Sequence, residues 1–162
     1  MPRKCERPDD ERFAAWPLLL ETHSKLVEIL DAELKARVAG LPLTWYDVLV
    51  QLSMSPEGRM PMQRLADSVL LSKSGVTRLV DRMERVDLVE RASCDADRRV
   101  VYARLTVKGK SLLRKARPIH VAGVEEHFSA HLTDTEARAI RNAFTKILDA
   151  ASSDKRRTER AG

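Results

Sequence analysis

Two adjacent arginines, Arg98 and Arg99, stand in the segment CDADRRVVYARLT, residues 94–106, between an acidic, turn-rich stretch and a β-branched run. A guanidinium is planar, always charged and able to bind phosphate oxygens or a base edge with two hydrogen bonds. Paired arginines on a turn therefore suit a polyanion, in particular the strongly negative minor groove of DNA. The alternative is an ordinary solvated turn.

The positive charge of the chain is concentrated around these arginines. Residues 72–120 carry 13 Lys and Arg against 6 Asp and Glu, whereas residues 1–71 carry 9 against 11, and the net charge of the whole chain is +5. A local basic excess of this kind is typical of a phosphate-facing surface.

Length and composition bound the class of protein. A chain of 162 residues with 43% hydrophobic content is long enough for one domain with a substantial core. No apolar run approaches the ~20 residues of a membrane span, and the polar first residues do not fit a signal peptide, so we expect a cytoplasmic protein. Cys5 and Cys94 lack a C-x-x-C spacing and are predicted to be free thiols, with oxidation of Cys94 left open. The motifs of phosphate-binding loops, dinucleotide sites and zinc proteases are absent, so neither an enzyme nor a cofactor is predicted.

Three helices are expected before the basic region. Apolar residues recur at helical spacing from about residue 10 to 39, where Pro17 allows either a helix that starts near Trp16 or a kinked one. A second helix is expected from Thr44 as its N-cap to about residue 54. A third, very short helix follows, with Pro61 at its first position.

The helix expected over residues 72–86, capped by Ser72, has two distinct faces. The apolar face comprises Val76, Leu79, Val80, Met83 and Val86. The polar side comprises Ser74, Thr77, Arg78, Asp81, Arg82 and Arg85. A short helix, a turn and an amphipathic helix with a hydroxyl and arginine outer face are typical of a helix-turn-helix.

Two β-type segments, DLVERA and RVVYARL, follow this helix and predict a hairpin with Arg98 and Arg99 at its tip. A hairpin directly after a recognition helix makes a winged helix. Thr106 then caps a helical stretch from about residue 107 to 131, in which Pro118 is expected to force a kink or break. Thr133 and Glu136 have capping-box spacing and open a final helix.

This order of elements, together with DADRRVVYARLTVKG, resembles the multiple antibiotic resistance regulator (MarR) family of bacterial transcription factors. The family signature, D-x-R followed by a strand and L-T-x-x-G, corresponds to Asp97, Arg99, Leu105, Thr106 and Gly109, and the segment VTRLVDRMERVDLVER matches the family's recognition helix and following strand. The resemblance covers about residues 11–150. It implies an obligate homodimer in which the terminal helices of two chains interlock.

The predicted fold is therefore mainly α with a small β-hairpin, in a single MarR-like domain over residues 1–162. Its dimerisation helices are expected over 11–42 and 107–150, its winged helix-turn-helix over 43–106, and a frayed basic tail over 151–162. Apolar stripes on the terminal helices, beyond what a winged helix needs for its own core, support a dimer.

The predicted function is a sequence-specific, double-stranded DNA-binding regulator, a ligand-responsive repressor acting as a homodimer on an inverted repeat. The expected DNA contacts are Ser72, Ser74, Thr77, Arg78, Arg82, Arg85, Arg98 and Arg99. Ser74, Thr77 and Arg78 are the candidates for base edges, Arg82 and Arg85 for phosphates. The resemblance implies that Asp97 or Asp81 orients Arg99.

The sequence does not decide which ligand or metal ion the regulator responds to. By resemblance the ligand is a small phenolic or aromatic acid, and Trp16, His23 and Trp45 are the candidates to line its pocket, with core packing as the alternative. His127 and His131, spaced i, i+4, raise the alternative of a metal-responsive regulator, against an ordinary surface pair; no metal is predicted. A winged helix that binds only proteins is a further alternative, which the basic excess disfavours.

Overall fold

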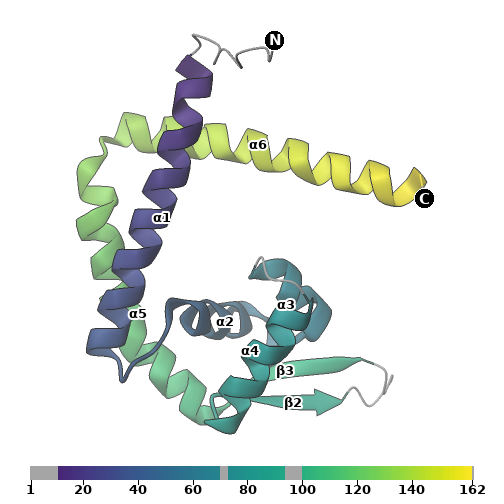
Figure 1. Ribbon diagram of the computed structural model, residues 1–162. Helices are drawn as coiled ribbons and strands as arrows, with labels where there is room; N and C mark the ends of the chain where they lie inside the picture. The colour runs from purple at the N-terminus through teal and green to yellow at the C-terminus, as the bar shows by residue number, and fades with distance from the viewer. Residues whose placement is uncertain (1–10, 70–72, 94–99, 162) are drawn as a thin grey trace, which may run out of the picture. The chain divides into compact units, whose positions relative to one another are not determined.

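The computed structural model describes residues 11–69, 73–93 and 100–161. This part of the chain is mainly helical with one small antiparallel sheet, which confirms the predicted fold class (Figure 1). The elements in chain order are α1 (Glu11–Arg37), α2 (Leu43–Met54), η1 (Pro56–Gly58), β1 (Arg59–Pro61), α3 (Met62–Ser68), α4 (Lys73–Arg85), β2 (Val89–Ser93), β3 (Val101–Leu105), α5 (Val107–His127), η2 (Ser129–His131) and α6 (Asp134–Ala161).

The chain divides into two compact units, residues 1–123 and 124–162. The first unit holds the winged helix. The predictions made for Cys5, Ser72, Cys94, Asp97, Arg98 and Arg99 lie outside the described residues.

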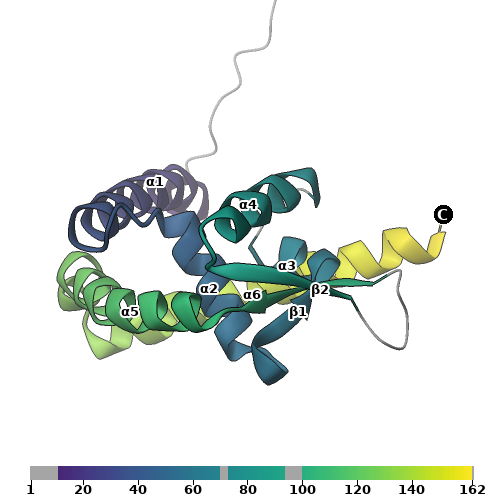
Figure 2. The ribbon, with the colours of Figure 1, turned by 90° about the horizontal axis from the view of Figure 1, so that it is seen from below.

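The core of the first unit forms where α2, α3 and α4 meet the sheet. Its fully enclosed side chains include Val48, Leu49, Leu52, Leu65, Val76, Val80, Met83 and Ala103, each with no exposed surface. Burial of each valine, leucine or methionine of this kind stabilises a domain by about 1.5–3 kcal/mol relative to exposure. This core fixes α4 on the sheet, and α4 lies beside the strands in both views of the ribbon (Figures 1 and 2).

The sheet has three strands in the order β1-β3-β2, all antiparallel. The sequence predicts β2 and β3 but misses β1. Met60 pairs with Ala103 and is almost fully buried, so it joins β1 to the hydrophobic core. Because β1 spans only three residues and ends at Pro61, it lacks the alternating pattern that identifies strands. α3 consequently begins at Met62, and Pro61 precedes the helix instead of occupying its first turn.

The expected cap of α2 was wrong. The helix begins at Leu43, one residue before Thr44, and no side chain of its own caps it. Instead the backbone N–H of Leu43 donates to Oδ1 of Asp31, at 2.9 Å, from the preceding helix. The hydrogen bond with Lys35 and this bond to Leu43 lower the pKa of the Asp31 carboxyl. A tertiary contact thus replaces the local cap.

Neither internal proline breaks its helix. α1 is continuous from Glu11 through Pro17, and α5 is continuous through Pro118. Residues 11–20 are all exposed, so water can satisfy a carbonyl that a proline leaves without an N–H partner.

The frayed tail expected from residue 151 was also wrong, because α6 continues to Ala161. Residues 151–161 contain neither glycine nor proline and include several good helix formers.

α4 ends in a Schellman motif at Asp87, a non-glycine residue with φ of 60°. The N–H of Leu88 donates to Met83 O at 3.0 Å, and that of Asp87 to Glu84 O at 2.9 Å. The reversal leaves Val86 42% exposed, although it was expected on the apolar face, and Leu88 is buried in its place.

The caps predicted for the last two long helices are confirmed. Oγ1 of Thr106 accepts the N–H of Gly109 at 2.9 Å and lies within hydrogen-bond distance of the carbonyls of Asp87 and Leu88. Thr133 and Glu136 form the reciprocal capping box, and the hydrogen bonds from Thr133 lower the pKa of the Glu136 carboxyl.

In the part of the chain that the structure describes, no helix has the length and apolar character of a membrane span.

Candidate nucleic-acid interface

The outer side of α4 presents the polar residues that the sequence singled out. Ser74, Thr77, Arg78, Arg82 and Arg85 are all exposed. The opposite face is buried, with Val76, Leu79, Val80 and Met83 at most 3% exposed. The helix is thereby fixed in rotation, so its hydroxyl and arginine side must face outward.

A single arginine of β2 neutralises the two acidic residues of this helix. Nη2 of Arg91 lies 2.6 Å from Oδ1 of Asp81, and its Nη1 lies 2.7 Å from Oε2 of Glu84. The backbone N–H of Arg91 also donates to Oε1 of Glu84 at 3.1 Å. Asp81, expected to orient Arg99, therefore has Arg91 as its partner among the described residues.

The helix before α4 completes a helix-turn-helix. Leu65 and Ala66 of α3 are buried against the same core. β2 and β3 follow α4 as the stem of a hairpin and pair from Val89 with Leu105 to Ser93 with Val101. Arg104 of β3 pairs with Glu90 of β2 on this stem.

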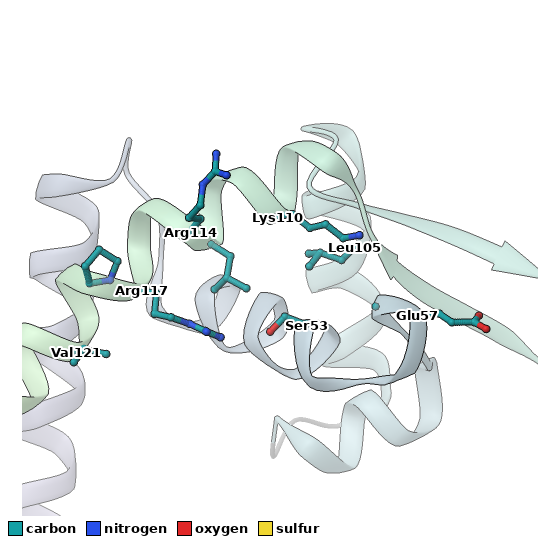
Figure 3. Close-up of a pocket in the computed structure, with 10 residues that line it drawn as sticks. Ser53, Glu57, Leu105, Lys110, Arg114, Arg117 and Val121 are labelled. Atoms are coloured by element: carbon teal, nitrogen blue, oxygen red, sulfur yellow. The ribbon is translucent and has the colours of Figure 1, made fainter.

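A second site is a groove between α5 and the winged helix, with a volume of about 800 Å³. Three basic side chains of α5, Lys110, Arg114 and Arg117, line it together with apolar atoms of Leu113, Pro118 and Val121. Figure 3 shows Arg117 reaching toward Ser53 of α2, whereas the side chains of Arg114 and Glu57 point away from Ser53. Such a mixture of apolar walls and a cation suits a small amphipathic anion.

The residues that the sequence suggested for a ligand do not line this groove. Trp16 is 61% exposed and His23 is exposed, both on α1, and Trp45 is partly buried against the hydrophobic core. Sequence reasoning missed Lys110, Arg114 and Arg117. Their spacing of four and three residues places them on one side of a helix, which is the signal that was available.

A cluster of titratable groups lies where α5 packs on α2. The rings of Tyr46 and His120 are 4.5 Å apart, and Nδ1 of His120 is buried with no hydrogen-bond partner among the described residues. Burial lowers the pKa of His120, while the negative charge of Asp47 opposes that shift. Partial desolvation raises the pKa of Asp47, although its surface is exposed, and burial raises the pKa of Tyr46.

This cluster predicts a loss of stability in mild acid. Folding lowers the pKa of His120 below 6.5, so the unfolded chain binds a proton at this histidine more readily than the folded chain does. The free energy of unfolding therefore falls as the pH drops through this range. We expect the free energy of unfolding to decrease between about pH 7.5 and pH 5.5, and to decrease less in His120→Phe, which keeps an aromatic ring against Tyr46. Urea denaturation at each pH measures this.

Asp47 changes the free energy of unfolding in the opposite direction to His120. Because its pKa is raised in the folded state, its protonation stabilises the folded state as the pH falls toward 3.8. The comparison is therefore repeated in an Asp47→Asn background. Equal pH dependence with and without His120 in both backgrounds would contradict the assignment.

The two histidines considered for a metal do not share a helix face. α5 ends at His127, and His131 closes the separate turn η2. The i, i+4 argument requires a continuous helix, so it fails.

The buried face of α4, its exposed hydroxyl and arginine side and the paired strands behind it define a winged helix-turn-helix DNA-binding protein. Residues 39–100 match a family model described as the MarR family. Among solved structures, AbsC from Streptomyces coelicolor, a MarR family transcriptional regulator, is 34% identical with a TM-score of 0.84, and the match covers 91% of this chain and 99% of AbsC. Sco3205, a MarR family regulator from the same organism solved in complex with DNA, is 28% identical with a TM-score of 0.82, and the match covers 92% of each chain.

A curated relative, the HTH-type transcriptional regulator MhqR of Bacillus subtilis (strain 168), is 37% identical over 91 residues. This match covers 56% of the present chain and 62% of MhqR, which is less than two thirds of that relative's length. The chain belongs to the MarR family of DNA-binding transcriptional regulators, and not to a class of enzymes.

Proposed function

We propose that the protein represses transcription by binding, as a homodimer, to an inverted repeat in double-stranded DNA. The observation that carries the proposal is the exposed side of α4, where Arg78, Arg82 and Arg85 stand outward while the other side of the helix is locked in the core. In helix-turn-helix proteins the early residues of such a helix read base edges. Ser74, Thr77 and Arg78 take that role here, and Arg82 and Arg85 contact phosphates. A dimer that covers a promoter excludes the polymerase.

The remaining contacts in this proposal are Ser72, at the start of the reading helix, and the wing arginines Arg98 and Arg99. These contacts, and the orienting role of Asp97, stay predictions from the sequence. Arg98 and Arg99 are proposed to enter the minor groove, where a guanidinium is favoured by the negative potential.

The homodimer is supported by exposed apolar side chains on the terminal helices. Phe13, Trp16 and Leu18 of α1 are 59–64% exposed, and Ile147 and Leu148 of α6 are 61% and 66% exposed. Several large, exposed apolar side chains on each of these helices favour a protein interface. We propose that residues 11–42 and 107–150 cover one another between two copies, which would make dimerisation inseparable from folding.

The groove beside α5 is proposed to bind the signal, a small aromatic acid. Its carboxylate would pair with Arg117 or Lys110, and its ring would lie against Leu113 and Pro118. The groove lies between α5 and the winged helix, so a bound ligand would change how the winged helix is held on α5. In the proposed dimer this would change the separation of the two α4 helices. Release of DNA by benzoate or salicylate in the parent, and not in Arg117→Ala, tests this part.

The DNA-binding proposal predicts strong dependence on salt and on operator symmetry. We expect affinity to fall by about 10³–10⁵ between 50 and 200 mM salt if 6–10 phosphates are contacted. We also expect preference for two half-sites centred about 10 bp apart over one half-site. Selection from a random DNA pool, followed by titration of the selected duplex and its half-site, measures both.

The assembly state is checked on the same sample by analytical ultracentrifugation. A folded monomer at micromolar concentration, or equal affinity for the half-site and the full repeat, would rule out the homodimer on an inverted repeat.

A further inference from the structure

We propose that Arg91 is a positioning residue for DNA binding, whose role is to mask the carboxylates of Asp81 and Glu84 on the DNA-facing helix. The inference rests on the proposed role of α4 as the reading helix. It assigns to Arg91 a function other than contact with DNA itself.

The position of Asp81 creates the need for a mask. At about 100° per residue, Asp81 lies on the same stripe of α4 as Arg78 and Arg85, the side that is exposed. A carboxylate at that point repels the phosphates that the neighbouring arginines attract. An acidic residue there is compatible with DNA binding only if its charge is compensated nearby.

Arg91 provides that compensation through a fixed geometry. One guanidinium nitrogen lies 2.6 Å from Asp81 and another lies 2.7 Å from Glu84, and the backbone N–H of Arg91 also bonds Glu84. The side chain of Arg91 is 30% exposed, less than those of Asp81 at 39% and Glu84 at 37%. With its donors directed at two carboxylates, Arg91 is placed to hold α4 on β2 and not to reach a phosphate.

Arg104 is a matched control within the same sheet. It also forms an ion pair, with Glu90, but that pair joins β3 to β2 and includes no residue of α4. Loss of either arginine removes one positive charge from the hairpin stem. Only loss of Arg91 exposes a carboxylate on the reading helix.

The test is a charge-rescue series measured on the selected operator at low salt. We expect Arg91→Gln to weaken binding by roughly threefold to tenfold, and Arg104→Gln to change it by less than about twofold. We expect Arg91→Gln combined with Asp81→Asn to bind within about twofold of the parent, since the pair removes the carboxylate together with its mask. A residue that only braced the fold would not be rescued in this way.

Circular dichroism and urea denaturation establish that each variant is folded. If Arg91→Gln does not fold, Arg91→Lys takes its place, because one ammonium keeps the charge but cannot hold both carboxylates as a planar fork. Arg91→Lys is then expected to bind more weakly than the parent, with rescue by Asp81→Asn. Unchanged binding by Arg91→Gln, or a loss that Asp81→Asn does not restore, overturns the inference. Failure of the parent itself to bind any duplex would instead refute the proposed function.

Discussion

Replacement of Gly109 by alanine is expected to destabilise the protein by about 3 kcal/mol or more. A Cβ at this position would lie 2.1 Å from the carbonyl oxygen of Leu88 and 3.1 Å from its carbonyl carbon. That carbonyl cannot easily move, because it accepts the N–H of Thr106 at 3.3 Å and closes the link between α4 and α5. The helix propensity that alanine gains over glycine is only about 1 kcal/mol. Urea denaturation of the parent and Gly109→Ala measures the difference.

Gly123 in the same helix is the control. A Cβ there would meet Oε2 of Glu33 at 2.6 Å and Cδ2 of Leu30 at 2.8 Å, both at the far ends of flexible side chains. These side chains can turn aside, and alanine favours the helix, so we expect a change within about 1 kcal/mol. Similar losses in both variants would mean that close contact with the Leu88 carbonyl is not what requires a glycine at position 109.

The reading helix could be predicted from the sequence because its pattern is local and its environment is uniform. Val76, Leu79, Val80 and Met83 recur at helical spacing, and each is buried. The pattern failed one turn later at Val86, since the chain reverses at Asp87. Aspartate is less favoured than glycine in the left-handed region, so nothing in the local sequence marked the end of the helix strongly.

The features that the sequence could not predict depend on partners distant in the chain. Asp31 caps α2 from the preceding helix, and β1 pairs with β3, more than forty residues later in the chain. The partner of Asp81 is Arg91, ten residues later on a strand. In each case the local pattern is compatible with several partners, and the tertiary fold selects one.

The groove beside α5 is a candidate functional site that also depends on residues distant in the chain, so the local sequence could not predict it. Lys110, Arg114 and Arg117 are visible in the sequence as one side of a helix, but a basic helix face is most often a solvated surface. What makes them a candidate site is the concave wall that Ser53 and Gly58 provide opposite α5. That wall comes from a segment more than fifty residues earlier.

Arg78→Ala is expected to cost about 1–3 kcal/mol in binding free energy on the preferred operator and to relax base preference at one position of each half-site. Arg78 is exposed in the first two turns of α4, next to Thr77 and opposite the buried Val76 and Val80. A guanidinium there can bind a guanine edge with two hydrogen bonds, and alanine leaves those acceptors without a donor. Titration against the operator and its single-base variants measures both effects.

Arg82→Ala gives the contrast that makes the assignment testable. Arg82 is also exposed on α4, one turn later, and is proposed to contact a phosphate. Its loss should weaken binding to all duplexes alike and reduce the slope of log affinity against log salt by about 1. Arg37→Ala, which removes an exposed arginine from the end of α1, controls for net charge alone. If Arg78→Ala weakened every sequence equally and changed the salt slope as Arg82→Ala does, Arg78 would be a phosphate contact, and base readout by α4 would have to come from Ser74 and Thr77.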